Sequence, residues 1–199
     1  IGILVFIQII FIISSFIILT YYQSQSTYMG NSINIAGKNR FLTSNLMFEI
    51  SKYSVEDSTK DVSKINSAIN QFESYILALR DGGKAASIDL MPLQVEFLNA
   101  WNNVHQKWIS LKTIIANNII EPSDKTIGSI DKLTQRSLET EALSLVNLSN
   151  ILVTKLGEYV RSNSESLLFN QSIFIILDMS VIAAFVLYLT RKILKPIMS

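Results

Sequence analysis

The sequence predicts an all-α protein, and three features of its 199 residues support this fold class. Apolar residues recur every three or four positions over long stretches, which is the spacing of amphipathic helices. Only seven glycines and three prolines interrupt the chain, so turns and strands have few of the residues they favour. Two other stretches are predominantly apolar and are long enough to cross a bilayer. Together these features predict an extracytoplasmic up-down-up-down four-helix bundle flanked by two transmembrane helices.

The two apolar stretches also predict how the chain crosses the membrane. The first carries no charged residue, and no small-x-small cleavage site follows it, so we expect an uncleaved anchor. The second is followed by Arg191, Lys192 and Lys195, which place its end in the cytoplasm by the positive-inside rule. We therefore expect a two-pass protein of the cell membrane with both termini cytoplasmic. The expected parts are a first transmembrane helix (1–20), an outer helical domain (21–172), a second transmembrane helix (173–190) and the start of a linker (191–199).

The outer domain divides into four expected helices joined by short turns. The first continues the membrane helix to about Asp57, and the second runs from about Ser58 to Arg80, where Asp81-Gly82-Gly83 ends it. The third begins near Met91-Pro92, because proline is favoured in a first helical turn, and runs to about Ile120. The fourth runs from about Ser123 into the membrane. Helices of this length with short connections are typical of a four-helix bundle.

Each of the first three helices has an apolar face that we expect in the core. His105 lies between two tryptophans of the third helix, where a haem or metal role is conceivable. Two core tryptophans with a partnered histidine are the favoured interpretation. The expected core faces are Ile35, Leu42, Leu46, Ile50 and Tyr53 on the first helix, Val62, Ile65, Ile69, Phe72, Ile76 and Leu79 on the second, and Phe97, Trp101, Val104, Trp108, Leu111 and Ile115 on the third.

The composition excludes several classes of function. The chain has no cysteine, which removes disulfides, thiol catalysis and cysteine zinc sites, and its single histidine rules out a histidine-rich metal site within one subunit. A formal net charge of +1 argues against nucleic acid as a partner. Phosphate-binding loops, nucleophile elbows and metalloprotease motifs are missing, and the acidic residues are scattered. We therefore expect neither an enzyme nor a cofactor in this chain.

A second stripe on the first helix is the strongest sign of a binding site. Ile33, Gly37, Arg40, Ser44 and Met47 follow a 4-3-4-3 spacing, which is that of a coiled-coil seam. If the same helix of a second subunit packs there, Arg40 faces its own copy and the two guanidinium groups repel. A small oxyanion between them would remove the repulsion, with Asn34 and Ser44 adding hydrogen bonds. The alternative is that Arg40 forms an intramolecular salt bridge or snorkels to solvent.

The segment INIAGKNRFLTS, residues 33–44, resembles the motif of the PilJ-type sensor domain, the N-terminal region of type IV pilus methyl-accepting chemotaxis proteins. It is also similar to the corresponding segment of NarX-type nitrate/nitrite sensor kinases. Asn34, Ala36, Gly37, Arg40 and Leu42 match, whereas Phe41 replaces a methionine and Ile35 stands where some nitrate sensors have lysine. The resemblance implies a periplasmic four-helix bundle whose arginine pair binds nitrate or nitrite at a dimer interface. The expected ligand-binding residues are Arg40, Gly37, Asn34, Ser44, Ile33 and Thr43, the last aligning with a serine of the family.

The segment RKILKPI, residues 191–197, resembles the opening of a HAMP linker, which joins such sensors to signalling domains. We therefore expect the sensor region of a histidine kinase or chemotaxis protein, with its output C-terminal to Ser199. The expected receptor is a homodimer that senses a small anion, nitrate or nitrite. The alternatives are a sensor of an organic ligand or partner protein, and a ligand-free membrane-anchored structural protein.

One acidic residue lies inside the second apolar stretch. Asp178 is unusual there, because charged residues within membrane spans are rare and often functional. Two interpretations are open. Asp178 either accepts hydrogen bonds from Ser14 or Ser15 of the first span, or it is hydrated or protonated near the outer interface.

Overall fold

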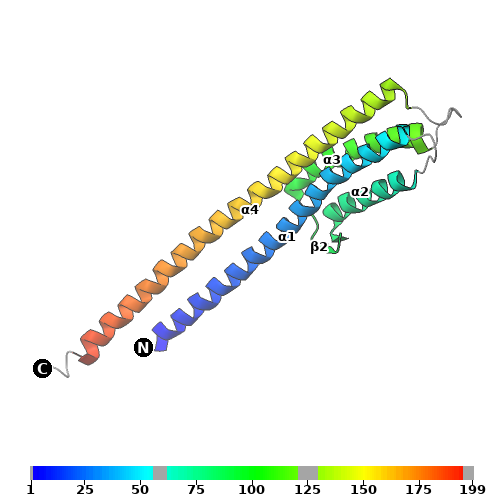
Figure 1. Ribbon diagram of the computed structural model, residues 1–199. Coiled ribbons are helices and arrows are strands. Elements are labelled where there is room, and N and C mark those ends of the chain that lie inside the picture. Colours follow the sequence, from blue (N-terminus) through cyan, green and yellow to red (C-terminus); the bar gives the residue numbers. More distant parts are fainter. Residues whose placement is uncertain (1, 56–61, 121–129, 195–199) are drawn as a thin grey trace. The chain divides into compact units, whose positions relative to one another are not determined.

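The computed structural model describes residues 2–55, 62–120 and 130–194, and this part of the chain is mostly helical (Figure 1). The two longest helices, α1 and α4, contain the two apolar stretches, which confirms the expected helical class and the two long apolar helices. The elements are α1 (Gly2–Val55), α2 (Ser63–Asp81), β1 (Gly83–Ala85), β2 (Ile88–Leu90), α3 (Val95–Ile115), the π-helical segment η1 (Ala116–Ile120), α4 (Lys132–Leu189) and the π-helical segment η2 (Thr190–Leu194).

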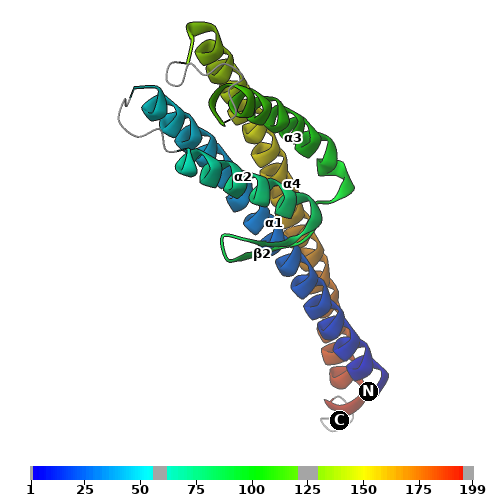
Figure 2. The ribbon, with the colours of Figure 1, turned by 90° about the vertical axis from the view of Figure 1, so that its right-hand side faces the viewer.

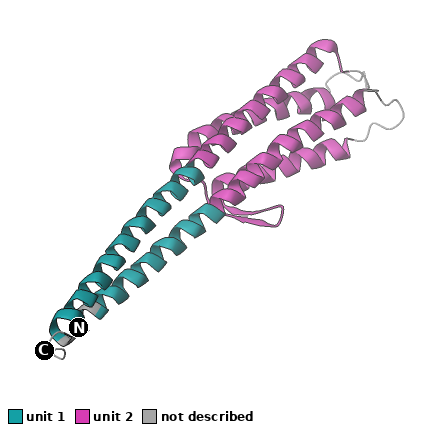
Figure 3. Cartoon of the chain, turned by 60° about the vertical axis from the view of Figure 1, so that its left-hand side comes forward, with its two compact units in different colours: residues 1–27, 159–199 teal, residues 28–158 magenta. Residues whose placement is uncertain are grey.

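The chain divides into two compact units, which Figure 3 colours separately. Unit 1 comprises residues 1–27 and 159–199 and contains the apolar parts of α1 and α4. Unit 2 comprises residues 28–158 and contains α2, α3, the two strands and the remaining parts of α1 and α4.

The core of unit 2 follows the apolar faces that the sequence predicts. Every expected core residue of α3 is buried, as are five of the six expected on the second helix and four of the five expected on α1. Val62, just before α2, and Tyr53 are half-buried instead. The rings of Phe72 and Trp108 stack with centroids 4.1 Å apart, and Trp101 Nε1 donates a hydrogen bond to the Ile76 carbonyl at 2.7 Å. These contacts join α2 to α3 and remove large aromatic surfaces from water, which is the main source of stability in such a core.

Ion pairs at the surface of unit 2 connect α3 to the helices on either side of it. Lys112 Nζ lies 2.8 Å from a Glu73 carboxylate oxygen on α2, and Lys107 Nζ lies 3.0 Å from Glu141 on α4. Figure 2 shows α2, α3 and α4 from a second direction. Where α4 begins, the Asp131 carboxylate accepts hydrogen bonds from the backbone N–H groups of Leu133 and Thr134, which would otherwise be unpaired. These bonds, with one from the Thr134 hydroxyl, lower the pKa of Asp131.

A short antiparallel hairpin lies between α2 and α3, and the sequence analysis did not predict it. Lys84 pairs with Asp89, and the turn residues Ala86 and Ser87 have φ angles of 48° and 63°. Two consecutive left-handed residues are typical of a tight hairpin turn, which usually uses asparagine and glycine. Asn31 Nδ2 of α1 donates a hydrogen bond to the Asp89 carbonyl at 2.9 Å, so the hairpin is fastened to α1.

The observed helix ends differ from the expected ones in two places. α3 begins at Val95 instead of near Pro92, because Gln94 is extended (ψ 151°) and Leu93 N–H donates back to the carbonyls at the end of α2. Ile130 and Asp131 are not helical, so α4 begins later than expected. The expected end of the first helix near Asp57, the start of the second at Ser58 and the Glu121–Asp124 turn lie outside the described residues.

We predict that Gly82→Ala destabilises unit 2. Gly82 has φ 79°, and a Cβ atom there would lie 2.9 Å from Pro92 Cδ, so alanine is both strained and crowded. We expect a loss of about 1–3 kcal/mol, the usual cost of a non-glycine residue in such a conformation. Gly157→Ala is the matched control. A Cβ at Gly157 meets nothing within 4 Å, and alanine in a helix interior is favoured by about 1 kcal/mol over glycine.

Thermal unfolding of the full chain in lipid nanodiscs, followed by circular dichroism, measures both variants. We expect a lower midpoint for Gly82→Ala and an unchanged or higher one for Gly157→Ala. Equal midpoints for the two variants would contradict the role assigned to Gly82.

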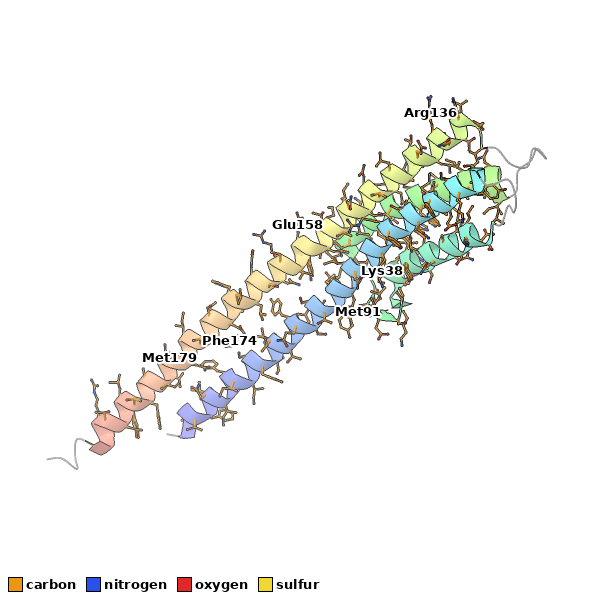
Figure 4. All side chains as sticks on the ribbon, in the orientation of Figure 1. Lys38, Met91, Arg136, Glu158, Phe174 and Met179 are labelled. Atoms are coloured by element: carbon orange, nitrogen blue, oxygen red, sulfur yellow. The ribbon has the colours of Figure 1, made fainter. Side chains whose placement is uncertain are left out.

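Unit 1 exposes apolar side chains around both of its helices. Ile3, Phe6 and Phe16 of α1 and Ile176 and Met179 of α4 are all more than half exposed. Figure 4 shows side chains projecting from these segments, with Met179 labelled. Both helices are long and apolar enough to cross a membrane. Such surfaces are unfavourable in water and suit the hydrocarbon of a bilayer.

Within unit 1, Asp178 has a different partner from the expected serines. Gln8 Nε2 of α1 donates a hydrogen bond to Asp178 Oδ1 of α4 at 3.2 Å. Asp178 is half-buried. Asp178 therefore accepts a hydrogen bond from the first apolar helix, as the first of the two interpretations expected. The donor is Gln8 instead of Ser14 or Ser15.

Candidate functional site

Arg40 lies on α1 within unit 2 and is half-buried. Its Nη1 donates a hydrogen bond to Asn150 Oδ1 on α4 at 2.6 Å. Asn150 is neutral, so this contact orients the guanidinium group without neutralising it. In the described part of the chain, no carboxylate forms an ion pair with Arg40. A partly buried positive charge without a counter-ion is unfavourable, so this position favours a bound anion.

The guanidinium group keeps donors available for such an anion. Arginine carries five N–H donors in a planar fork, and the bond to Asn150 uses one of them. A Cβ atom at Gly37 would lie 3.5 Å from Arg40 Nη2, which is an ordinary van der Waals distance. The protomer therefore has room for alanine at this position. Packing within the chain therefore does not require glycine at position 37.

The other expected site residues fall into two sets. Asn34 and Ser44 are exposed and Ile33 is half-buried, so all three are at least partly accessible to solvent. Ser44 lies one turn after Arg40 and Ile33 two turns before it on the same side of α1, whereas Asn34, six residues before Arg40, lies on a different side of the helix. The Ser44 hydroxyl donates to the Arg40 carbonyl at 3.3 Å, within its own helix. Thr43 is only 1% exposed, and its hydroxyl donates to the Asn39 carbonyl at 2.9 Å. Thr43 is therefore buried within unit 2, although it borders the surface groove described below.

A layer of buried polar side chains accompanies the contact between Arg40 and Asn150. Asn39 and Ser149, their sequence neighbours, are each only 1% exposed. In the described structure, three buried polar groups have no hydrogen-bond partner. They are the Asn39 Nδ2 and Oδ1 atoms and the Ser149 hydroxyl group. Each unpaired buried polar group costs about 1–3 kcal/mol. These unpaired groups of Asn39 and Ser149 therefore reduce the stability that burial provides at this level of α1 and α4.

The accessible face of α1 is also apolar. Phe41 and Phe48 are 70% and 63% exposed, and they lie seven residues apart with the exposed Ser44 between them. Beside them, Thr43, Ser44 and Met47 of α1 and Ala142, Leu143 and Val146 of α4 line a surface groove of about 410 Å³, which Glu139 also borders. Large apolar side chains clustered on a surface are typical of an interaction site.

The aromatic cluster around His105 is structural. Trp101 and Trp108 are fully buried, and the His105 ring stacks on Trp101 with centroids 4.6 Å apart. The Arg80 guanidinium group lies over the Trp101 ring, 5.0 Å from the ring centroid. Burial lowers the pKa of His105, and the positive charge of Arg80 lowers it further. These contacts agree with the favoured interpretation of two core tryptophans and a partnered histidine. Among the described residues, no group of three or more His, Asp or Glu side chains is placed to hold a metal ion.

A mostly helical chain in which α1 and α4 each carry a membrane-length apolar segment is consistent with a membrane protein. The family model of the N-terminal region of type IV pili methyl-accepting chemotaxis transducers (PilJ) matches residues 21–133. The match covers more than half of the chain, so the chain belongs to this family, which is not a catalytic one. Searches of curated proteins and of solved structures gave no match.

Proposed function

We propose that this chain is the sensor region of a transmembrane receptor, a chemotaxis protein or a histidine kinase, and that it senses a small anion at a homodimer interface. The observation that carries this proposal is Arg40, a half-buried guanidinium group that has a neutral partner in its own protomer and an open glycine beside it. Nitrate or nitrite fits this site, because a small planar oxyanion accepts paired hydrogen bonds from the guanidinium fork. The resemblance to NarX-type sensors that the sequence of residues 33–44 suggests would imply the same ligand class, whereas the family match over residues 21–133 is to chemotaxis transducers.

The accessible face of α1 supports a second copy of the chain as the partner. Gly37, Phe41, Ser44 and Phe48 follow a 4-3-4 spacing, which is that of a helix–helix seam, and both phenylalanines are more than half exposed. This seam shares Gly37 and Ser44 with the expected one but has Phe41 and Phe48 in place of Arg40 and Met47, so Arg40 lies at its edge. A two-fold axis along the seam brings each face against its own copy. An anion would then bind between the edge of one α1 helix and that of the other.

The proposed topology places unit 2 outside the cytoplasm. Arg191 and Lys192, which follow the apolar part of α4, favour the cytoplasmic side for that end. The helical segments of unit 2 then form an up-down-up-down four-helix bundle, with residues 21–172 as the sensor domain. The HAMP-like segment 191–197 leads to a signalling domain C-terminal to Ser199, as the family assignment favours.

The proposed signal depends on α1 and α4. An anion that binds two copies of α1 shifts the receptor between two arrangements only to the extent that it binds them with different affinity. The weakly paired layer at Asn39 and Ser149 lowers the cost of moving α1 against α4 within unit 2. A small displacement of one helix relative to the other is therefore the proposed output.

Calorimetric titration of the full chain in lipid nanodiscs with nitrate and nitrite tests the proposal. We expect Arg40→Ala to remove binding, because loss of one partner of a desolvated charge pair costs about 2–5 kcal/mol. Arg136→Ala is the matched control, since Arg136 is an exposed arginine of α4, and it should bind like the parent. The expected stoichiometry is one ion per dimer.

Two results would count against this function. Silence with both ions in a verified dimer would remove the anion as the ligand. A response that survives in Arg40→Ala would favour an organic ligand instead, and the groove lined by Met47 and Leu143 is the place where such a ligand would bind.

A further inference from the structure

Unit 1 contains a polar pair in a segment that is otherwise apolar. Gln8 Nε2 donates a hydrogen bond to Asp178 Oδ1 at 3.2 Å. The other polar atom of the same amide, Gln8 Oε1, is buried and has no hydrogen-bond partner in the described structure. A glutamine carbonyl inside a membrane span has no water to bond with, so an unpaired one is costly. The unpaired Oε1 therefore needs a donor close to the pair.

The surroundings of the pair offer no charged group. Val5 and Ile9 of α1 and Val181, Ile182 and Phe185 of α4 line an apolar cavity of about 280 Å³ beside Gln8. Residues 2–20 of α1 contain no Asp, Glu, Lys or Arg. Between residues 166 and 190 of α4, Asp178 is the only residue of these four types. The other titratable group of that segment is Tyr188, ten residues further along. An ionised Asp178 would therefore lie in an apolar setting without a counter-ion, which is strongly unfavourable.

The hydrogen-bonding capacities of the two side chains identify the missing donor. A carboxylate only accepts hydrogen bonds, whereas a protonated carboxyl group has one acceptor oxygen and one O–H donor. A primary amide offers the complementary set, an N–H donor and a carbonyl acceptor. The two groups can therefore form two hydrogen bonds at once, from Gln8 N–H to one Asp178 oxygen and from the Asp178 O–H to Gln8 Oε1.

We propose that Asp178 carries a proton and forms this reciprocal pair with Gln8, so that a neutral clamp joins the two membrane helices of one protomer. The proposal rests on the membrane placement proposed above but not on the anion ligand. The clamp fixes the register of α1 against α4 in unit 1. A displacement of either helix along its axis by one turn breaks both hydrogen bonds, so the clamp opposes that displacement.

Infrared spectroscopy of the full chain in nanodiscs at pH 7 tests the protonation. The difference spectrum between the parent and Asp178→Asn should contain the C=O stretching band of a protonated carboxyl group. Gln8→Leu should keep that band but shift it to higher frequency, because the carboxyl carbonyl loses the hydrogen bond from the amide. A difference spectrum without a protonated carboxyl band would overturn the proposal. The proposal would also be wrong if Gln8→Leu left the frequency of that band unchanged.

Disulfide cross-linking tests whether the pair joins the helices. The natural chain has no cysteine, so Ile9→Cys on α1 and Val181→Cys on α4, which line the same cavity, report on how closely the two helices approach. Asp178→Asn should keep the cross-linking yield of the parent, because an asparagine amide forms the same reciprocal pair with Gln8. Asp178→Leu should reduce the yield roughly threefold, the effect of an average interhelical hydrogen bond in a membrane.

The cross-linking yields of Asp178→Asn and Asp178→Leu are compared only after circular dichroism shows that both variants have the same helix content as the parent. Equal losses in Asp178→Asn and Asp178→Leu would show that the charge of a carboxylate is required, and the clamp would then be wrong. Neither experiment includes nitrate or nitrite, so its outcome is separate from that of the anion titration.

Discussion

Trp108→Ala is expected to lower the free energy of unfolding of the helical core by about 3–5 kcal/mol, the usual cost of truncating a buried tryptophan. Trp108 is fully buried on α3, and its ring stacks on Phe72 of α2 at 4.1 Å with 22° between the planes. Alanine leaves a large cavity between these helices and removes the stacking contact. Since domains are stable by only about 5–15 kcal/mol in total, the loss is a large fraction of the whole.

Trp108→Phe is the matched control for this prediction. Its ring keeps most of the stacking on Phe72, and its smaller size costs less than alanine. The indole N–H of Trp108 has no hydrogen-bond partner in the described structure, so its removal sacrifices no hydrogen bond. Thermal and denaturant unfolding, followed by near-ultraviolet circular dichroism, should rank the parent above Phe and Phe above Ala. If Trp108→Ala unfolded at the same temperature and denaturant concentration as the parent, the core would not depend on this stacking contact.

The sequence was sufficient to predict the helices and their buried faces, because burial on a helix repeats every three or four residues. The six residues from Phe97 to Ile115 on α3 are all buried as expected. The same period also places Asn39 and Thr43 on the core face of α1, between Ile35 and Leu46. Their polar character led them to be left out of the expected core, and the family alignment led Thr43 to be assigned to the site. The repeat of the helix determined their position.

The hairpin between α2 and α3 was missed for a local reason. Its strands have three residues each, too few for an alternating pattern, and its turn uses Ala86 and Ser87 where asparagine and glycine are the usual signal. The turn conformation is stabilised by contacts distant in sequence, including the hydrogen bond from Asn31. Such contacts are not visible in a local sequence pattern.

The same limit applies to the partners of the site residues. Arg40 was recognised from its place on the 4-3-4-3 stripe of α1 and from the motif of residues 33–44, but its partner Asn150 lies 110 residues away on another helix. Asp178 was recognised as unusual within an apolar stretch, but its partner Gln8 is 170 residues away. Sequence spacing predicts which residues share a helix face. It does not give the register between two helices that are far apart in the chain.

Asn150→Asp is expected to reduce the affinity for the anion by about 10- to 100-fold while Arg40 remains in place, since charge-assisted hydrogen bonds are worth about 1.5–3 kcal/mol. Asparagine and aspartate have nearly the same shape, so the new carboxylate would lie where Asn150 Oδ1 now accepts a hydrogen bond from Arg40 Nη1 at 2.6 Å. An ion pair within the protomer would then compete with the external anion for the same guanidinium group. The variant should remain folded, because the pairing removes an uncompensated charge.

Asn150→Leu separates charge from shape in this test. Leucine removes the amide and leaves Arg40 charged with all its donors free, so the affinity for nitrate or nitrite should equal or exceed that of the parent. Calorimetric titration of both variants in nanodiscs measures the difference. An Asn150→Asp variant that binds like the parent would mean that the anion does not bind at Arg40. Equal losses in both variants would instead mean that the amide of Asn150 itself holds the anion. Only a loss confined to the aspartate variant fits a site in which the charge of Arg40 is the binding group and Asn150 is its resting partner.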